Sequence, residues 1–284
     1  MRSNEHYAPM QFNIAILDMY DGAPNQGMRC IRQLLDDFKK QSGADLSYTI
    51  FDVRGKAEVP DLSFDAYIST GGPGSPIDSV GTQWEERFFF LTDSIRAFNE
   101  NSSNVPKHLF LICHSFQLYN RYYGYGKVTK RLSTSFGVMP VHMNFSGAFE
   151  PFFEGLEDPF YVVDSRDWQV IEPNMKKLRS QGGEVLCIEK YRPHIKLERC
   201  IMAMRFDKTT FGTQFHPEAD AAGMLVHLNT DERRTQVTEL HGEEKYLSMI
   251  EHLNDEDKIV LTYNTIIPKF LETALREKLL IHIN

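Results

Sequence analysis

The chain has 284 residues, and its 31 basic and 39 acidic side chains give a formal net charge of −8. Hydrophobic residues make up 42% and charged residues 25%, which are values of folded globular proteins and exclude a disordered or collagen-like chain. Because the charge balance is acidic and no long basic stripe is present, neither a nucleic acid nor an anionic membrane is expected as the main partner.

The first half of the chain alternates between strand-like and helix-like segments. Short apolar runs predict strands at residues 12–17, 46–51, 64–70 and 109–112. Apolar residues at helical spacing predict helices at residues 27–40 and 84–99. This alternation predicts right-handed crossovers and an α/β fold with a doubly wound, mostly parallel sheet and flanking helices. In such sheets, ligands bind beyond the carboxyl ends of the strands.

The second half of the chain has a different pattern. Shorter strand-like segments at 137–141, 160–163, 185–188 and 200–204 predict a small β-rich addition to one edge of the sheet. The chain becomes polar from Ala219 onward, and a last helix is expected at about 263–280. We expect three parts: a loose lead-in at 1–11, a main domain at 12–225, and a helical extension at 226–284 packed on that domain.

The cysteines and the lengths of the apolar runs indicate the cellular compartment in which the protein is expected. Four cysteines, Cys30, Cys113, Cys187 and Cys200, lie far apart, with no C-x-x-C pair and no apolar leader. This pattern favours a reducing compartment over a disulfide framework. The apolar runs are far shorter than the roughly 20 residues that a membrane span needs. We therefore expect a cytoplasmic protein with no membrane partner.

Three segments could carry chemistry. Cys113 directly follows a predicted strand and precedes a helix-forming segment, which is where a side chain is lifted above a sheet and a thiolate is favoured. Residues 211–218 end in His216 and Glu218, so the acid can orient the imidazole. Residues 71–76 (GGPGSP) can present backbone N–H groups to an anion. Each signal alone also fits an ordinary structural role, as a core cysteine or a tight turn.

Taken together, the order and spacing of these segments are similar to a family pattern. The chain resembles the class I glutamine amidotransferases of the triad type, including the glutaminase part of GMP synthase, over about residues 12–220. The matching segments are 71–76 (GGPGSP), 111–117 (LICHSFQ) and 212–218 (GTQFHPE). The family elbow reads G-x-C-x-G-x-Q, so Leu111 and Ser115 stand where the family has glycines. The resemblance implies a flavodoxin-like fold and makes 12–225 the amidotransferase-like domain.

The resemblance also implies a role for each matching residue. Cys113 would attack the side-chain amide of glutamine, His216 would shuttle the proton, and Glu218 would orient His216. The backbone N–H groups of Gly72 and His114 would form the oxyanion hole, and Gln117 would help to hold the substrate. Glutamate and ammonia would be the products, and no metal or organic cofactor is needed.

The use of the ammonia is left open by the sequence, which contains no Walker-type loop and no room for a synthetase after the last motif. One hypothesis is an amidotransferase or glutaminase that supplies a separate synthetase subunit. A second is a hydrolase of other γ-glutamyl amides on the same scaffold. A third is a catalytically weak relative that acts as a binding or regulatory partner.

Overall fold

The computed structural model describes residues 11–23, 25–101, 103–191 and 198–283. The lead-in predicted at 1–11 therefore lies outside the described residues except for Gln11, which begins the first strand. Within this part of the chain, no helix is both long enough and apolar enough to cross a membrane. The division into a main domain and a C-terminal extension stays a prediction.

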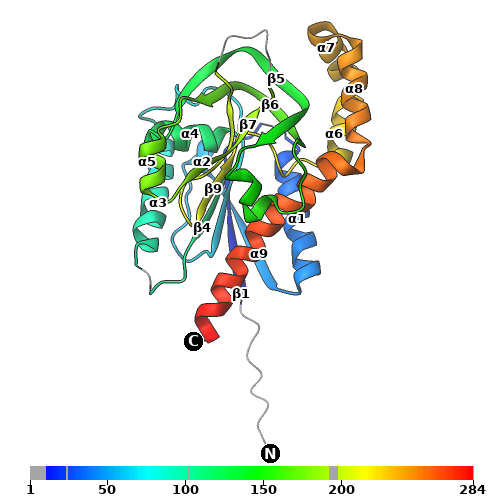
Figure 1. Ribbon diagram of the computed structural model, residues 1–284. Helices are drawn as coiled ribbons and strands as arrows, with labels where there is room; N and C mark the ends of the chain where they lie inside the picture. Colours follow the sequence, from blue (N-terminus) through cyan, green and yellow to red (C-terminus); the bar gives the residue numbers. More distant parts are fainter. Residues whose placement is uncertain (1–10, 24, 102, 192–197, 284) are drawn as a thin grey trace, which may run out of the picture.

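Nine strands form one sheet in the part of the chain that the structure describes, in the order β2-β1-β3-β4-β9-β8-β7-β5-β6 (Figure 1). The first five of this series pair in parallel, and the other four continue the sheet in antiparallel fashion. The predicted doubly wound sheet with a β-rich edge addition is thus confirmed. The strands are β1 Gln11–Asp18, β2 Asp45–Asp52, β3 Ala66–Ser69, β4 His108–Ile112, β5 Lys127–Met143, β6 Phe160–Ile171, β7 Glu184–Glu189, β8 Ile201–Arg205 and β9 Thr210–Thr213.

Helices cover both faces of the sheet. One face carries α1 and α9, and the opposite face carries α3, α4 and α5, as Figure 1 shows. The α-helices are α1 Gly27–Ser42, α2 Val53–Lys56, α3 Gln83–Asn99, α4 His114–Tyr123, α5 Met175–Ser180, α6 Ala221–Leu228, α7 Asp231–His241, α8 Glu243–Leu253 and α9 Leu261–Ile283. Short helical turns occur at Gly147–Phe149, Pro151–Phe153 and Glu256–Val260.

The core explains why the parallel strands read as continuous apolar runs. Successive side chains of a strand point to opposite faces, and here both faces are covered. In β1, Ile14 and Ile16 pack toward α1 and α9, whereas Ala15 and Leu17 pack toward the other helical layer. All four side chains are fully buried, so a polar residue at any of these positions would lose its contact with water.

The antiparallel addition is longer than the sequence indicates. Strand β5 has 17 residues and pairs with β6 through a register shift between Lys130 and Ser135. The first residues of β5 are polar and partly exposed, so they lack the apolar run that marks a buried strand. Helices α6 and α8 pack on β5 and β6 in a separate apolar cluster that includes Val138, Val163 and Met249.

Candidate active site

Cys113 occupies a sharp turn between β4 and α4. Its φ of 47° and ψ of −95° are strained for a residue with a side chain, at a typical cost of about 1–3 kcal/mol. Two backbone hydrogen bonds hold the turn: Cys113 N–H donates to Thr213 O at 2.8 Å, and Gln117 N–H donates to Cys113 O at 3.0 Å. The bond to Thr213 O also ties the turn to β9, the strand beside β4 that leads to His216.

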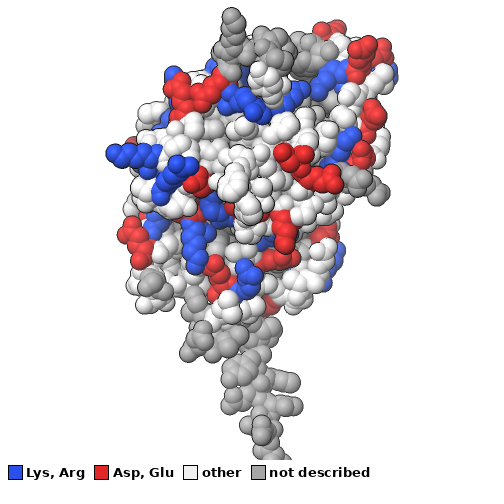
Figure 2. All heavy atoms as spheres, viewed as in Figure 1, with Lys and Arg blue, Asp and Glu red and all other residues white. Residues whose placement is uncertain are grey.

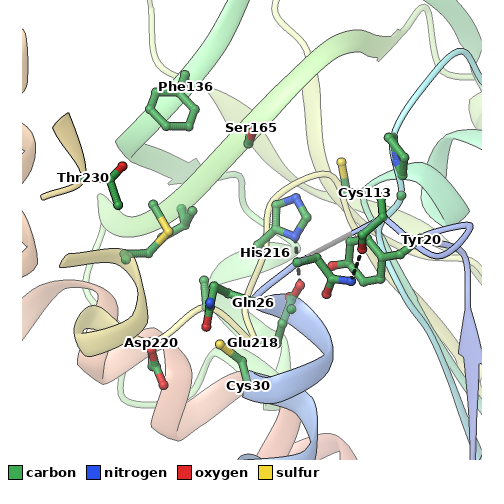
Figure 3. Close-up of a pocket in the computed structure, with 18 residues that line it drawn as sticks. Tyr20, Gln26, Cys30, Cys113, Phe136, Ser165, His216, Glu218, Asp220 and Thr230 are labelled. Carbon is green, nitrogen blue, oxygen red and sulfur yellow. Dashed lines mark hydrogen bonds and ion pairs between the residues drawn. The ribbon is translucent and has the colours of Figure 1, made fainter. Parts of the chain in front are cut away.

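His216 and Glu218 meet Cys113 just beyond the end of β9. The Nδ1 of His216 lies 2.8 Å from Oε1 of Glu218 (Figure 3), and the side chain of Cys113 lies close enough to the imidazole to raise its pKa. The backbone N–H of His216 donates to Val163 O at 2.9 Å, which fixes the segment against β6. Glu218 is only 1% exposed. The structure thus brings together the three side chains that the sequence selected.

The electrostatics of His216 follow from these contacts. Burial disfavours the charged imidazolium, but the nearby Glu218 carboxylate with its hydrogen bond, together with the Cys113 side chain, outweighs this effect. The pKa of His216 therefore lies well above its usual range. An imidazolium held in this way can give a proton to a departing group.

The glycine turn lies directly against these side chains. A Cβ added to Gly71 would lie 2.7 Å from Cε1 of His216 and 3.6 Å from Cβ of Cys113. A Cβ added to Gly72 would lie 2.3 Å from the carbonyl oxygen of Met19. Both positions therefore need glycine for close approach rather than for an unusual backbone angle.

His114 is the first residue of α4, so its backbone N–H has no acceptor within the helix. Its side chain is 2% exposed, and burial together with the charges of Arg54 and Arg121 lowers its pKa to about 3. The imidazole of His114 is consequently neutral at physiological pH. His114 is not among the described residues that line the cavity at Cys113, and the role of its backbone N–H as an oxyanion donor stays a prediction.

Leu111, the larger of the two departures from the family elbow, is accommodated without covering the thiol. Leu111 is fully buried and packs with Phe116 in the core between the sheet and α3–α5, whereas Cys113 belongs to the core on the opposite face. Leu111 pairs with Ser69 on one side and Gly212 on the other. These small neighbours leave room for it, because a Cβ on Gly212 would already lie 3.3 Å from that of Leu111.

Gln117 does not line the cavity that the described residues form. It is 2% exposed, and its Nε2 donates to the carbonyl oxygen of Trp168 at 3.2 Å. The amide that does approach the thiol belongs to Gln214, whose Nε2 lies 3.8 Å from Sγ of Cys113. The sequence analysis missed Gln214 as a separate contact, although it lies within the 212–218 motif.

Cys113 opens into a cavity of about 690 Å³, a size typical of small-molecule sites. Figure 3 shows His216 and Glu218 at its centre. Its walls are polar and apolar residues from the loop after β1, from α1, from β5 and β6, and from the segment after β9. The residues that sequence reasoning missed here are Tyr20, Ala23, Asn25, Gln26, Gly27, Cys30, Pro73, Phe136, Val163, Ser165, Ala219, Asp220, Met224 and Thr230.

The second thiol in the cavity, Cys30, differs from Cys113. Burial raises the pKa of Cys30 to about 11, so it stays a protonated thiol at physiological pH. No group of three or more His, Cys, Asp or Glu side chains in the described part of the chain is arranged to hold a metal ion. The reactive candidates in the cavity are therefore Cys113 and His216.

A cysteine on a strained turn, beside a histidine that a carboxylate orients, is the arrangement of proteins that use an activated thiol as a nucleophile. The family model "Glutamine amidotransferase class-I" matches residues 29–225, which are 197 of the 284 residues. The chain belongs to this family. None of the curated proteins matches it significantly.

Solved structures share the fold at low sequence identity. A glutamine amidotransferase from Thermotoga maritima is 15% identical, with a TM-score of 0.57 over 93% of this chain and 98% of that one. A glutamine amido transferase from Methylobacillus flagellatus is 12% identical, with a TM-score of 0.56 over 94% of each chain. The glutaminase domain of Trypanosoma brucei CTPS, with bound acivicin, is 13% identical, with a TM-score of 0.51 over 73% of this chain and 86% of that one.

Proposed function

We propose that this chain hydrolyses the side-chain amide of glutamine to glutamate and ammonia. The proximity of Cys113 to the His216–Glu218 pair, in the lining of one cavity, carries this proposal. Membership of the class-I amidotransferase family supports it. An amide is a poor electrophile, so a nucleophile, a proton shuttle and fixed donors all have to converge on it.

In the proposed reaction, the proton of Cys113 already lies on His216, because the raised pKa of His216 favours the imidazolium, and Sγ of Cys113 forms a bond to the amide carbon. The resulting oxyanion accepts hydrogen bonds from the N–H groups of Gly72 and His114. The carbon–nitrogen bond then breaks, and His216 gives its proton to the leaving nitrogen to form ammonia. Water, deprotonated by His216, attacks the thioester and releases glutamate, which leaves Cys113 free with its proton on His216, as at the start.

The other residues in the proposal orient their neighbours and take no part in bond making or breaking. Glu218 accepts a hydrogen bond from Nδ1 of His216 and so directs the other ring nitrogen toward Cys113. Gln117, which the family pattern assigns to the substrate, would act indirectly by holding Trp168 of β6, the strand that also carries the cavity residue Ser165. The ammonia would serve a synthetase carried by a separate subunit.

A direct assay tests this proposal. The purified full chain should release equimolar ammonia and glutamate from glutamine, and a glutamine-like chloroketone should label Cys113. Cys113→Ala should abolish both results. Cys187→Ala is the matched control, because Cys187 is a fully buried core thiol whose pKa is raised by burial, and this variant should keep both activities. Unlabelled Cys113 and no ammonia from the wild-type chain would overturn the proposal.

One observation favours a second candidate, a hydrolase of larger γ-glutamyl amides. The cavity extends past His216 to Phe136 (Figure 3). Phe136, Val163 and Met224 all line it and supply an apolar wall where an amine larger than ammonia could lie. Comparing kcat/KM for glutamine and for γ-glutamyl butylamide decides between the two substrates. A higher value for the butylamide would favour the second candidate, and turnover of glutamine alone would exclude it.

A further inference from the structure

Thr70 lies directly behind the proposed oxyanion donors. It follows β3, is fully buried, and its hydroxyl makes two hydrogen bonds. The backbone N–H of Met19 donates to Oγ1 of Thr70 at 2.9 Å, and Oγ1 lies 2.8 Å from the carbonyl oxygen of Gly71. Because an N–H group can only donate, the single hydroxyl hydrogen of Thr70 is directed to Gly71 O.

This bond orients the next peptide group. The cis peptide in the described part of the chain is Asp158–Pro159, so the Gly71–Gly72 bond is trans. In a trans peptide the carbonyl and the N–H point in opposite directions. Holding Gly71 O against Thr70 therefore directs the N–H of Gly72 the other way, and Gly72 lines the cavity beside Cys113.

Ser115 connects the same threonine to the elbow. Its Oγ donates to the carbonyl oxygen of Thr70 at 2.5 Å and lies 2.7 Å from Oγ of Ser69. Since the one hydroxyl hydrogen of Ser115 goes to the carbonyl, Ser69 is the donor in the second bond. Ser115 is adjacent to His114, which carries the other proposed donor. A glycine, the residue that the family pattern has at this position, could form neither bond.

We propose that Thr70 and Ser115 are positioning residues that hold the N–H groups of Gly72 and His114 at a fixed separation for a developing oxyanion. Gly71 O, the Thr70 side chain, the Thr70 carbonyl and the Ser115 hydroxyl form one continuous link between the two donors. The inference rests on the proposed function, because it concerns the oxyanion of that reaction. It assigns to Ser115 a role specific to this chain, in place of a glycine.

Two substitutions remove the link. Thr70→Val keeps the shape of the side chain but loses the hydroxyl, and Ser115→Ala loses the bond to Thr70 O. Each should lower kcat for glutamine about 10- to 100-fold with KM little changed, since losing an oxyanion donor or misplacing it by about 1 Å has effects of this order. Thr70→Ser, which keeps the hydroxyl, should restore most of kcat.

Thr92→Val is the matched control. Thr92 is also fully buried, and its Oγ1 bonds to Phe89 O at 3.0 Å and Tyr123 OH at 2.8 Å, within the α3–α4 layer. This variant loses the same group from the core without touching the glycine turn. Its thermal stability should fall like that of Thr70→Val, whereas its kcat should equal that of the wild type.

Two further readouts separate positioning from general damage. Acylation of Cys113 by p-nitrophenyl acetate passes through an oxyanion and should slow in Thr70→Val and Ser115→Ala, whereas alkylation by iodoacetamide forms no oxyanion and should be unchanged. If both variants acylate at the wild-type rate, the inference is wrong. If they slow while the wild-type chain leaves glutamine intact, the inference stands and the proposed function falls.

Discussion

Gly71→Ala tests how closely the glycine turn defines the position of His216. The added Cβ would lie 2.7 Å from Cε1 of His216, whereas ordinary contact begins at 3.4 Å, so the ring has to move by about 0.7 Å. Misplacement of about 1 Å can cost about 100-fold in rate, so we expect kcat to fall about 10- to 100-fold. In free energy this is about 1.4–2.7 kcal/mol of lost transition-state stabilisation.

The measurement combines steady-state release of ammonia from glutamine with urea unfolding. Overpacking of this kind typically costs about 1–3 kcal/mol in the free energy of unfolding. Gly126→Ala is the control: its Cβ would lie 2.6 Å from Cγ1 of Val170, a comparable clash with a side chain. Gly126 follows α4 and lies at the end of that helix opposite Cys113.

We expect both alanine variants to lose stability, but only Gly71→Ala to lose kcat. If kcat of Gly71→Ala stays within about twofold of the wild type, a loss of less than about 0.5 kcal/mol, then the turn does not position His216. Equal losses of kcat in both variants would show that the effect comes from stability alone.

Four further predictions concern charge and packing. Glu218→Gln should lower the pKa of His216, because the carboxylate that raises it is lost. Since His216 must be protonated to release the amine, the alkaline limb of the kcat/KM profile should move to lower pH. An unmoved limb would contradict this. The same variant should lose less activity than His216→Ala. Leu111→Ala should lower the free energy of unfolding in urea by about 2–5 kcal/mol, with iodoacetamide still reacting at the active cysteine. Asp164→Asn should cost less than the roughly 3–5 kcal/mol of an uncompensated buried charge by the same measurement, because the buried guanidinium of Arg166 loses Asp164 at 2.8 Å but keeps Glu189 at 3.8 Å.

The parallel half of the fold could be predicted closely from the sequence. The helix expected at 27–40 is Gly27–Ser42 and the one expected at 84–99 is Gln83–Asn99, because apolar periodicity is strong where one helix face is buried. By contrast, the first residues of β5 are polar and gain their strand structure by pairing with β6. Because these residues of β5 bury little apolar surface, their pairing with β6 leaves no apolar run in the sequence.

The candidate site also has a part that could be predicted from the sequence and a part that could not. Cys113, His216 and Glu218 lie in short contiguous motifs, so their order along the chain was enough to select them. The cavity walls come from segments that lie far apart, such as Phe136 in β5 and Met224 in α6, and only folding brings them together. Ser115 was visible in the sequence as a departure from a family glycine, but its partner Thr70 was not.

The position of β9 determines when the sheet can form during synthesis of the chain. This strand is the last of the sheet in the chain, yet it lies between β4 and β8 in the middle of the sheet. Until residues 210–213 have been synthesised, β4 and β8 each lack the strand that pairs with one of their edges. Unpaired strand edges are templates for aggregation. Thr210–Thr213 must therefore leave the ribosome before the parallel and antiparallel parts of the sheet can join. Only then can His216, which follows β9, reach Cys113.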